Sequence, residues 1–285
     1  MNFYLPDFFN HEKLNIKIIE LQKTNPEYFI DNCNIAAVYG SFPGMIWNGG
    51  RCLTGYCDYN TTKSIIEKFN NNNIPLRFTL TNSHLEKYHF FDTYCHSVLD
   101  LADNGMNGII VNDENLEEYL RALYPNFNYV LSTTRCERNV DKINEATQKY
   151  DMVVIDYRDN KNLDFLNAIE DKNKIEILIN AYCHPECPKR MQHYDLLSFD
   201  QIHRTEMIKS LGKCPGASNF YEALNFSTTF NNEELLQYID MGFSNFKIEG
   251  RLSPLIDVIE SYVYYLIKPE YQHIVRLILL KYCIV

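Results

Sequence analysis

The segment N-F-K-I-E-G-R, residues 245–251, alternates charged residues with apolar or small ones. Successive side chains of a β-strand point to opposite faces, so this alternation predicts that Lys247, Glu249 and Arg251 share one face. Charges that point into a barrel are costly unless they pair with one another or with a bound anion near the open end. The segment therefore indicates a site at the end of a strand. The alternative is a structural Lys-Glu-Arg network that only fills the barrel mouth.

Working outward from this segment, short β-rich runs alternate with helical patterns along the chain. This order predicts parallel strands joined by crossover helices, and eight strands predict an α/β fold of the (β/α)8 TIM-barrel type. Such a barrel takes about 250 residues, so the 285 residues suit a single domain, 1–285. The expected strands are Asn34–Gly40, Leu76–Thr81, Gly108–Val111, Tyr129–Thr133, Met152–Tyr157, Ile175–Tyr182, Asn225–Thr228 and Asn245–Gly250. The expected helices are Thr62–Asn70, Tyr94–Asn104, Leu116–Leu123, Val140–Lys149, Leu163–Ile169 and Glu233–Met241.

One connection, 183–224 after the expected sixth strand, is too long for an ordinary βα loop of about 2–6 residues. It contains three cysteines, three histidines and a helical pattern at Phe199–Leu211. Active sites of (β/α)8 barrels lie at the face where the βα loops gather. We therefore expect this segment to be an elaborated, metal-binding loop.

The cysteines of this loop favour a metal centre. Cys183 and Cys187 lie at a strand end with three residues between them, and both Cys187 and Cys214 precede proline. A Cys-Pro pair is a recurring feature of iron-sulfur ligation. A [4Fe-4S] cluster needs four thiolates, and every candidate follows an expected strand end. The expected ligands are Cys52, Cys183, Cys187 and Cys214, with Cys57 and Cys136 as other candidates for the fourth position.

Two other interpretations of the cysteines stay open. Three thiolates with His184 or His193 would also suit a structural zinc ion. Alternatively, all nine cysteines are small buried hydrophobic residues. An odd number of cysteines without an export signal argues against a disulfide framework. Three others are expected to be structural thiols: Cys33, Cys95 and Cys283.

Two more strands contribute polar residues to the inward faces. Asp156 and Arg158 alternate with apolar residues on the expected fifth strand. Polar residues at positions 77, 79 and 81 alternate in the same way on the second. These side chains predict a cavity with charges of both signs, suited to a polar or carboxylate-bearing ligand.

Composition disfavours two classes of partner. The chain has 37 acidic and 27 basic residues, a net charge of −10 and no basic run, which disfavours nucleic-acid binding. Residues 1–17 lack the basic and apolar blocks of a secretory signal. The apolar tail Ile274–Val285 is shorter than the roughly 20 residues of a membrane span and contains Arg276 and Lys281. We expect a cytoplasmic protein whose tail is a docked helix or a subunit contact.

The motif K-I-E-G-R at 247–251, after G-F-S-N-F and before a helix, resembles the C-terminal barrel signature of the peptidase U32 family. The segments V-Y-G at 38–40 and N-A-Y-C at 180–183 fit the same order. That family includes collagenase-like peptidases and oxygen-independent hydroxylation proteins with a [4Fe-4S] cluster. The resemblance implies cluster ligation by Cys183, Cys187 and Cys214, with Cys52 near the place of a further ligand. The family's G-x-C signature is absent here, and C-H-P-E-C-P stands in its place.

These observations predict a U32-type iron-sulfur enzyme with redox or hydroxylation-like chemistry on a small or peptide-borne polar substrate. Lys247 and Arg251 would hold a carboxylate or oxyanion, and Glu249 would position them or move a proton. His193 and Asp156 complete the expected catalytic set. The alternatives are a zinc-dependent or U32 peptidase-like hydrolase, although no Ser-His-Asp order or H-E-x-x-H motif occurs, and a non-catalytic subunit. Homo- or hetero-oligomers would join through the C-terminal helices, 262–265 and 274–280.

Overall fold

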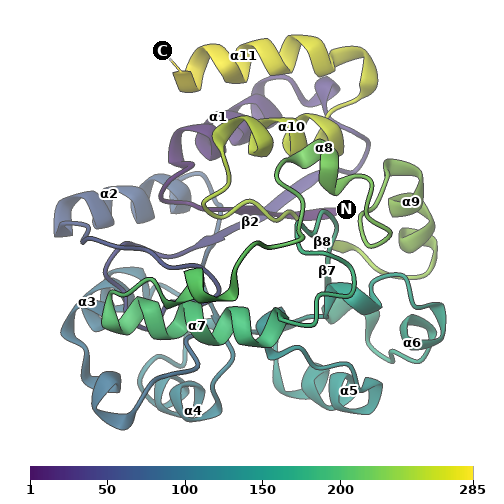
Figure 1. The fold of residues 1–285 in the computed structure, drawn as a ribbon. Coiled ribbons are helices and arrows are strands. Elements are labelled where there is room, and N and C mark those ends of the chain that lie inside the picture. Colours follow the sequence, from purple (N-terminus) through teal and green to yellow (C-terminus); the bar gives the residue numbers. More distant parts are fainter. Residues whose placement is uncertain (285) are drawn as a thin grey trace.

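The computed structural model describes residues 1–284 as a closed barrel of eight parallel strands, with helices outside it (Figure 1). The strands follow chain order around the barrel, and the last one pairs with the first. The predicted (β/α)8 architecture is therefore confirmed. The strands are β1 (Asn2–Pro6), β2 (Asn34–Gly40), β3 (Leu76–Leu80), β4 (Gly108–Val111), β5 (Asn128–Leu131), β6 (Met152–Val154), β7 (Ile175–Leu178) and β8 (Asn245–Lys247).

The helices begin mainly at asparagine or aspartate caps. In α2 to α6, α8 and α9, the side chain before the helix accepts a hydrogen bond from a backbone N–H of the first turn, as N-caps do. The bounds are α1 (Glu12–Thr24), α2 (Tyr59–Asn70), α3 (Thr93–Ala102), α4 (Glu114–Leu123), α5 (Val140–Lys149), α6 (Leu163–Asn167), α7 (Arg190–His203), α8 (Phe220–Ala223), α9 (Asn232–Asp240), α10 (Leu255–Leu266) and α11 (Gln272–Ile284).

The strand count of eight was predicted with one strand in the wrong place. Residues 225–228, the expected seventh strand, form turns after α8, where the Asn225 side chain donates to the backbone of Tyr221. The missing strand is β1, which precedes the expected first strand and pairs with both β2 and β8. Each of these three strands begins with an asparagine, and the three side chains form a ladder. Asn34 donates to Asn2 at 2.9 Å, and Asn2 donates to Asn245 at 3.0 Å.

Alternation along the strands divides the apolar core into two parts. One set faces the helices and forms the large outer core, for example Phe3, Leu5 and Val38. The other fills the barrel interior and includes Tyr4 and Tyr39 with Ala37, Ile110, Val130 and Val154. The interior is thus packed with side chains, as in other barrels of this type. Any site must lie at its mouth.

Helix α7 crosses this mouth in the long connection between β7 and β8 (Figure 1). Near its start, Arg190 donates to Thr133 after β5, and near its end the Gln201 amide donates to carbonyls of Met45 and Leu53 after β2. The expected helix at Phe199–Leu211 is corrected to α7, which begins nine residues earlier and is followed by a 3-10 turn at Met207–Leu211. The elaborated loop therefore covers the site.

The C-terminal helix α11 packs against α1 and α10 (Figure 1). Its Arg276 makes a bidentate contact with Glu260 of α10, at 2.7 and 2.8 Å. This agrees with a docked tail, although Val285, its last residue, lies outside the described residues. Across residues 1–284 we find no helix with the length and apolar character needed to cross a membrane.

Candidate functional site

Strand β8 contributes Lys247 to a charged layer deep in the barrel. The Lys247 ammonium lies 2.8 Å from one oxygen of Glu176 on β7, and Arg77 on β3 lies 2.5 Å from the other. Both cations also lie over aromatic rings: Lys247 over Tyr39 at 3.8 Å and Arg77 over Tyr4 at 4.0 Å. Burial acts to raise the pKa of Glu176, but the two cations hold it below its ordinary value. This inner layer is internally paired.

A second charged layer lies above the end of β8, where the chain has left the sheet. The Glu249 carboxylate contacts Arg51 at 2.5 Å and accepts from the backbone N–H of Tyr182 at 3.2 Å. Its backbone is held by the Asn180 side chain, which both donates to it and accepts from it. Arg51 comes from the loop after β2, so this outer layer joins the ends of the two strands that flank β1.

Arg251 completes the outer layer without a carboxylate partner. Its guanidinium donates to Asn48 at 3.0 Å, to Thr79 at 2.6 Å and to the Gly49 carbonyl at 2.7 Å. None of the ion pairs within residues 1–284 includes Arg251. Burial, with the charge of Arg51 beside it, lowers the pKa of Arg251 to about 10. A partly buried cation with neutral hydrogen-bond partners only is the clearest anion-binding feature of the mouth.

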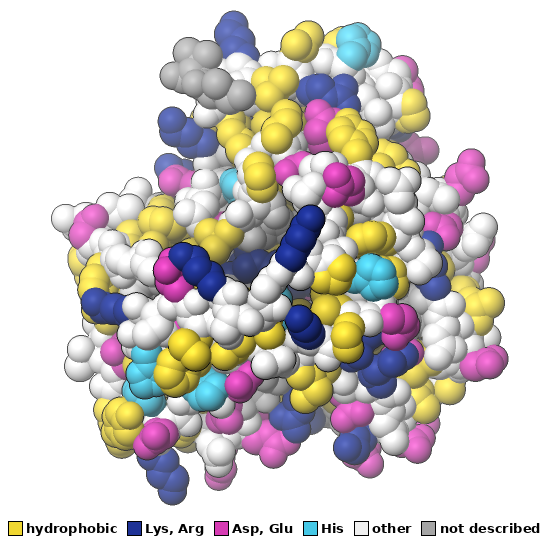
Figure 2. Space-filling view, viewed as in Figure 1, with side chains coloured by type: hydrophobic (Ala, Val, Ile, Leu, Met, Phe, Trp, Pro, Cys, Tyr) yellow, Lys and Arg dark blue, Asp and Glu magenta, His cyan; other side chains and the backbone are white. Residues whose placement is uncertain are grey.

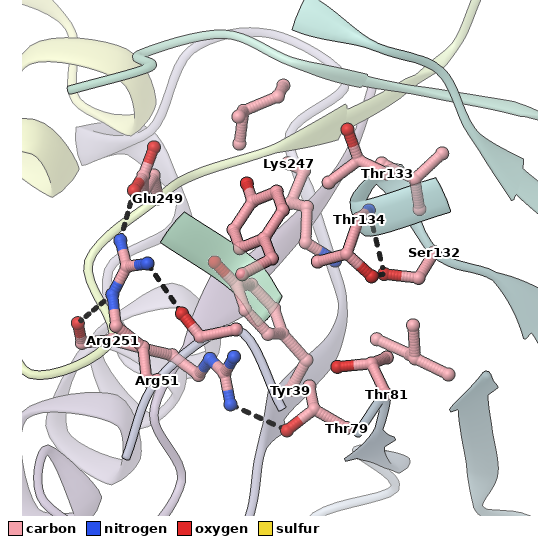
Figure 3. Close-up of a pocket in the computed structure, with 15 residues that line it drawn as sticks. Tyr39, Arg51, Thr79, Thr81, Ser132, Thr133, Thr134, Lys247, Glu249 and Arg251 are labelled. Carbon is pink, nitrogen blue, oxygen red and sulfur yellow. Dashed lines mark hydrogen bonds and ion pairs between the residues drawn. The ribbon is translucent and has the colours of Figure 1, made fainter. Parts of the chain in front are cut away.

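The charged layers enclose an inner chamber of about 70 Å³ (Figure 3). Lys247, Glu249 and Arg251 all line it, so the structure places the three charges of the K-I-E-G-R segment together. In Figure 3, hydroxyl groups gather on the side of the chamber away from Arg51 and Glu249. Those hydroxyl groups belong to Thr81, Ser132, Thr133 and Thr134.

An outer chamber of about 380 Å³ adjoins the inner one. Arg51, Tyr194 and Glu249 line both chambers, and His193 lines only the outer one. Burial and the positive charge of Arg51 lower the pKa of His193, so its imidazole is neutral at pH 7. A neutral imidazole can accept a proton. Figure 2 shows this face, with Lys and Arg side chains bordering the hollow.

Asp156, the remaining expected catalytic residue, is fully buried beneath the outer chamber. It accepts two hydrogen bonds of 2.9 Å from the Arg158 guanidinium, and Arg190 lies 3.4 Å away. Burial acts to raise its pKa, but these two cations hold it below its ordinary value. Asp156 lines neither chamber. Its geometry is that of a residue that positions Arg190, which does line the outer chamber.

The expected metal ligands lie in two places. Cys183 and Cys214 line the outer chamber, and Cys187 lines an adjoining pocket together with Cys214 and His193. Burial raises the pKa of Cys183 to about 11, and the neighbouring Cys187 thiol adds to that effect. Cys52 instead lines a separate depression with Asp200 and Gln201, near the C-terminal end of α7.

The other cysteines are distributed around the barrel. Cys136, in the left-handed region with φ of 54°, lies near Arg190, whose charge counteracts the effect of burial on its pKa. Cys57 is buried near Tyr94. Within the described part of the chain, no three His, Cys, Asp or Glu side chains are grouped so that they could hold one metal ion. The donors as they lie do not fit a four-thiolate cluster, which remains a prediction.

Sequence reasoning missed three important residues of the mouth: Arg51, Glu176 and Arg190. In the segment W-N-G-G-R-C, Cys52 was predicted to be a metal ligand, but the two glycines before Arg51 are the more informative signal. Gly50 has φ of +71°, and a Cβ there would lie 3.0 Å from the Arg251 guanidinium. Glycine is therefore required for the close approach of this loop to Arg251. Glu176 gave no signal, because it stands alone in an apolar run.

Comparisons with known proteins give a match among solved structures. No family model matches the sequence, and no curated protein matches it. Among solved structures, the U32 peptidase Mk0906 aligns with 89% of this chain and 94% of its own, with a TM-score of 0.54 and 17% sequence identity. At that identity the likeness concerns the fold. The resemblance to the peptidase U32 family, inferred from the K-I-E-G-R segment, is therefore confirmed at the level of the barrel.

Proposed function

We propose that the barrel mouth is the active site of an enzyme that acts on a small or peptide-borne substrate carrying an anionic group. The observation that carries this proposal is Arg251, a partly buried guanidinium with neutral hydrogen-bond partners only. A charge drawn away from water without a counter-ion is costly, so such a site favours a ligand that supplies the missing negative charge.

The charge balance of the mouth supports the same reading. Two of its carboxylates, Glu176 and Asp156, each contact two cations. The third, Glu249, contacts Arg51, and Arg251 lies beside that pair. The chain as a whole has a net charge of −10, so this local excess of positive charge stands out. Such a cavity attracts anions from solution.

The proposed roles follow from these contacts. Arg251 and Arg51 bind the anionic group. Glu249 holds Arg51 in place through one carboxylate oxygen, while the other accepts from the backbone N–H of Tyr182. His193, neutral at pH 7, takes up or delivers a proton in the outer chamber. Lys247 keeps Glu176 ionised and forms the chamber floor. This role differs from the direct anion binding expected for Lys247.

The test compares two arginine-to-glutamine variants by calorimetry with N-acetylated peptides and small carboxylates. Arg251→Gln is expected to weaken binding at least tenfold, since a hydrogen bond to a charged group contributes about 1.5–3 kcal/mol. Arg135→Gln, which removes an exposed guanidinium paired with Glu114, is the matched control and is expected to bind like the original protein. Equal affinities in both variants would reject the proposal.

The reaction type divides into a redox and a hydrolytic version. The redox version keeps the [4Fe-4S] cluster as its cofactor and is supported by Cys183 and Cys214 in the outer chamber and Cys187 in the adjoining pocket. The hydrolytic version, with or without zinc, is supported by His193 beside those thiols and by the U32 peptidase to which the fold is similar.

Anaerobic quantification of iron, sulfide and zinc separates the two versions. The redox version predicts iron and acid-labile sulfide in the purified protein, with loss of both in Cys183→Ala. Alanine substitution at Cys52, Cys57 and Cys136, one at a time, identifies any fourth ligand, and Cys33→Ala is the control. Zinc without iron would favour the hydrolase, and a protein free of both metals would leave metal-independent hydrolysis.

A further inference from the structure

One hydroxyl group of the inner chamber has no partner within the protein. Thr81, directly after β3, is only 4% exposed, and its Oγ1 makes no hydrogen bond within residues 1–284. Buried hydroxyl groups are nearly always hydrogen-bonded, and leaving one without a partner costs about 1–3 kcal/mol. Because Thr81 lines the chamber, a ligand there is in a position to satisfy it.

Arg251 has unused donors in the same chamber. A guanidinium carries five N–H groups, and three of those of Arg251 bind Asn48, Thr79 and Gly49. The two that remain are the Nε hydrogen and one hydrogen on the second terminal nitrogen. Two donors on one guanidinium match the two oxygens of a carboxylate, the pairing for which arginine is especially suited.

The position of these groups also fits a carboxylate. Thr79, which Arg251 contacts, and Thr81 are two residues apart, so their side chains point to the same face. The Thr81 hydroxyl therefore lies on the face that Arg251 reaches. The inner chamber, of about 70 Å³, has room for such a group but not for the body of a substrate.

We propose that the mouth takes its ligand carboxylate-first. A terminal carboxylate, from a free acid or a peptide C-terminus, enters the inner chamber and accepts hydrogen bonds from Arg251 and Thr81. The rest of the molecule occupies the outer chamber, whose 380 Å³ suits a short chain. This inference rests on the proposed function and adds the substrate class: acids that the site recognises by their terminal carboxylate.

The test measures binding by calorimetry to the full chain at pH 7, with four probes: N-acetyl-alanylalanine, its C-terminal amide, acetate and inorganic phosphate. The free acid is expected to bind at least tenfold more tightly than its amide, because the amide lacks the charge that Arg251 requires. It is also expected to bind more tightly than acetate, which leaves the outer chamber empty. Phosphate is expected to bind more weakly than the free acid.

Variants at Thr81 separate a ligand-binding hydroxyl from a structural one. Thr81→Val is expected to weaken binding of the free acid about fivefold, a factor typical of one lost hydrogen bond. Its melting temperature should stay the same or rise, because the hydroxyl has no partner in the protein. Thr81→Ser should restore binding. The matched control is Thr228→Val, which also removes a buried hydroxyl without a partner but lines neither chamber, so binding should not change.

The outcomes distinguish this inference from the function on which it rests. Equal binding of acid and amide, tighter binding of phosphate, or full affinity in Thr81→Val would overturn the carboxylate-first mode. If the acid still loses affinity in Arg251→Gln, the anionic site itself stands. If no anion depends on Arg251, both proposals fail.

Discussion

The two charged layers of the mouth receive residues from the same segment, yet they differ in their partners. Lys247, in the inner layer, lies 2.8 Å from Glu176 and 3.8 Å from the centre of the Tyr39 ring. Arg251, in the outer layer, contacts only neutral oxygens. Both are largely buried cations of one alternating motif. One is neutralised by the protein, and the other is available to a ligand.

The difference arises from the point at which the sheet ends. At Lys247, β8 is still paired with β7, which supplies Glu176 from within the barrel. Beyond it the chain leaves the sheet, and Arg251 reaches the Asn48 amide, the Gly49 carbonyl and a hydroxyl group of β3, all of which are neutral. Charges on one strand face can therefore be structural at one depth and functional at the next. The depth relative to the neighbouring strands decides which.

The largest expected effect comes from breaking the inner layer. Glu176→Gln removes the carboxylate and leaves Lys247 and Arg77 buried without a counter-ion, which typically costs about 3–5 kcal/mol. We expect the free energy of unfolding, measured with urea, to fall by about that amount. Glu114→Gln is the control, since its ion pair with Arg135 is exposed and contributes at most about 1 kcal/mol. Similar stability of the two variants would show that the inner layer is not structural.

A smaller effect is expected from crowding the outer layer. Gly50→Ala places a Cβ 3.0 Å from the Arg251 guanidinium and also strains a backbone with φ of +71°. The strain should cost about 1 kcal/mol of stability. Gly105→Ala has φ of +74° with no atom within 4 Å of the added Cβ, so it isolates the strain. Both variants should lose similar stability, but only Gly50→Ala should weaken binding of N-acetyl-alanylalanine. Equal binding of the peptide by the two variants would show that Gly50 does not affect the site.

The fold was largely predictable because strands and crossover helices leave local patterns. Seven of the eight strands were located from β-rich runs of four to eight residues, and the helices predicted between them are present. β1 was missed because Asn2–Pro6 is a single aromatic run at the chain start, with no helix before it. The seventh expected strand failed because its Asn and Ser residues favour turns.

The site was predictable only where its residues share one strand. Alternation alone placed Lys247, Glu249 and Arg251 together, and this needs no knowledge of distant segments. Arg51 and Glu176 lie about 200 and 70 residues away from their partners in the sequence, at contacts that the closed barrel creates. The cysteines were grouped by their spacing within one loop. Spacing cannot show that Cys52 lines a separate depression. Local pattern thus identified the strand, and topology supplied the partners.

The smallest expected effect is a titration that reports on the outer layer without altering it. His193 has a pKa below its ordinary value of 6.5, because it is buried and lies near the charges of Arg51 and Arg190, with Glu249 acting in the opposite direction. The unfolded chain therefore binds a proton here at a higher pH than the folded one. Stability from this group is present above pH 6.5 and is lost as the pH falls through the lowered pKa. His193→Gln should flatten that part of the pH profile.

Ligand binding should reverse the shift, because a carboxylate in the chambers partly cancels the charge of Arg51. NMR titration of the imidazole resonances is expected to place the midpoint of His193 below 6.5 in the free protein and nearer to 6.5 when N-acetyl-alanylalanine is bound. His89, whose pKa is also lowered by burial but which lines neither chamber, should titrate identically in both states. If the titration midpoint of His193 is the same with and without the ligand, the anion lies elsewhere, and the charges of the outer layer are as balanced within the protein as those of the inner layer.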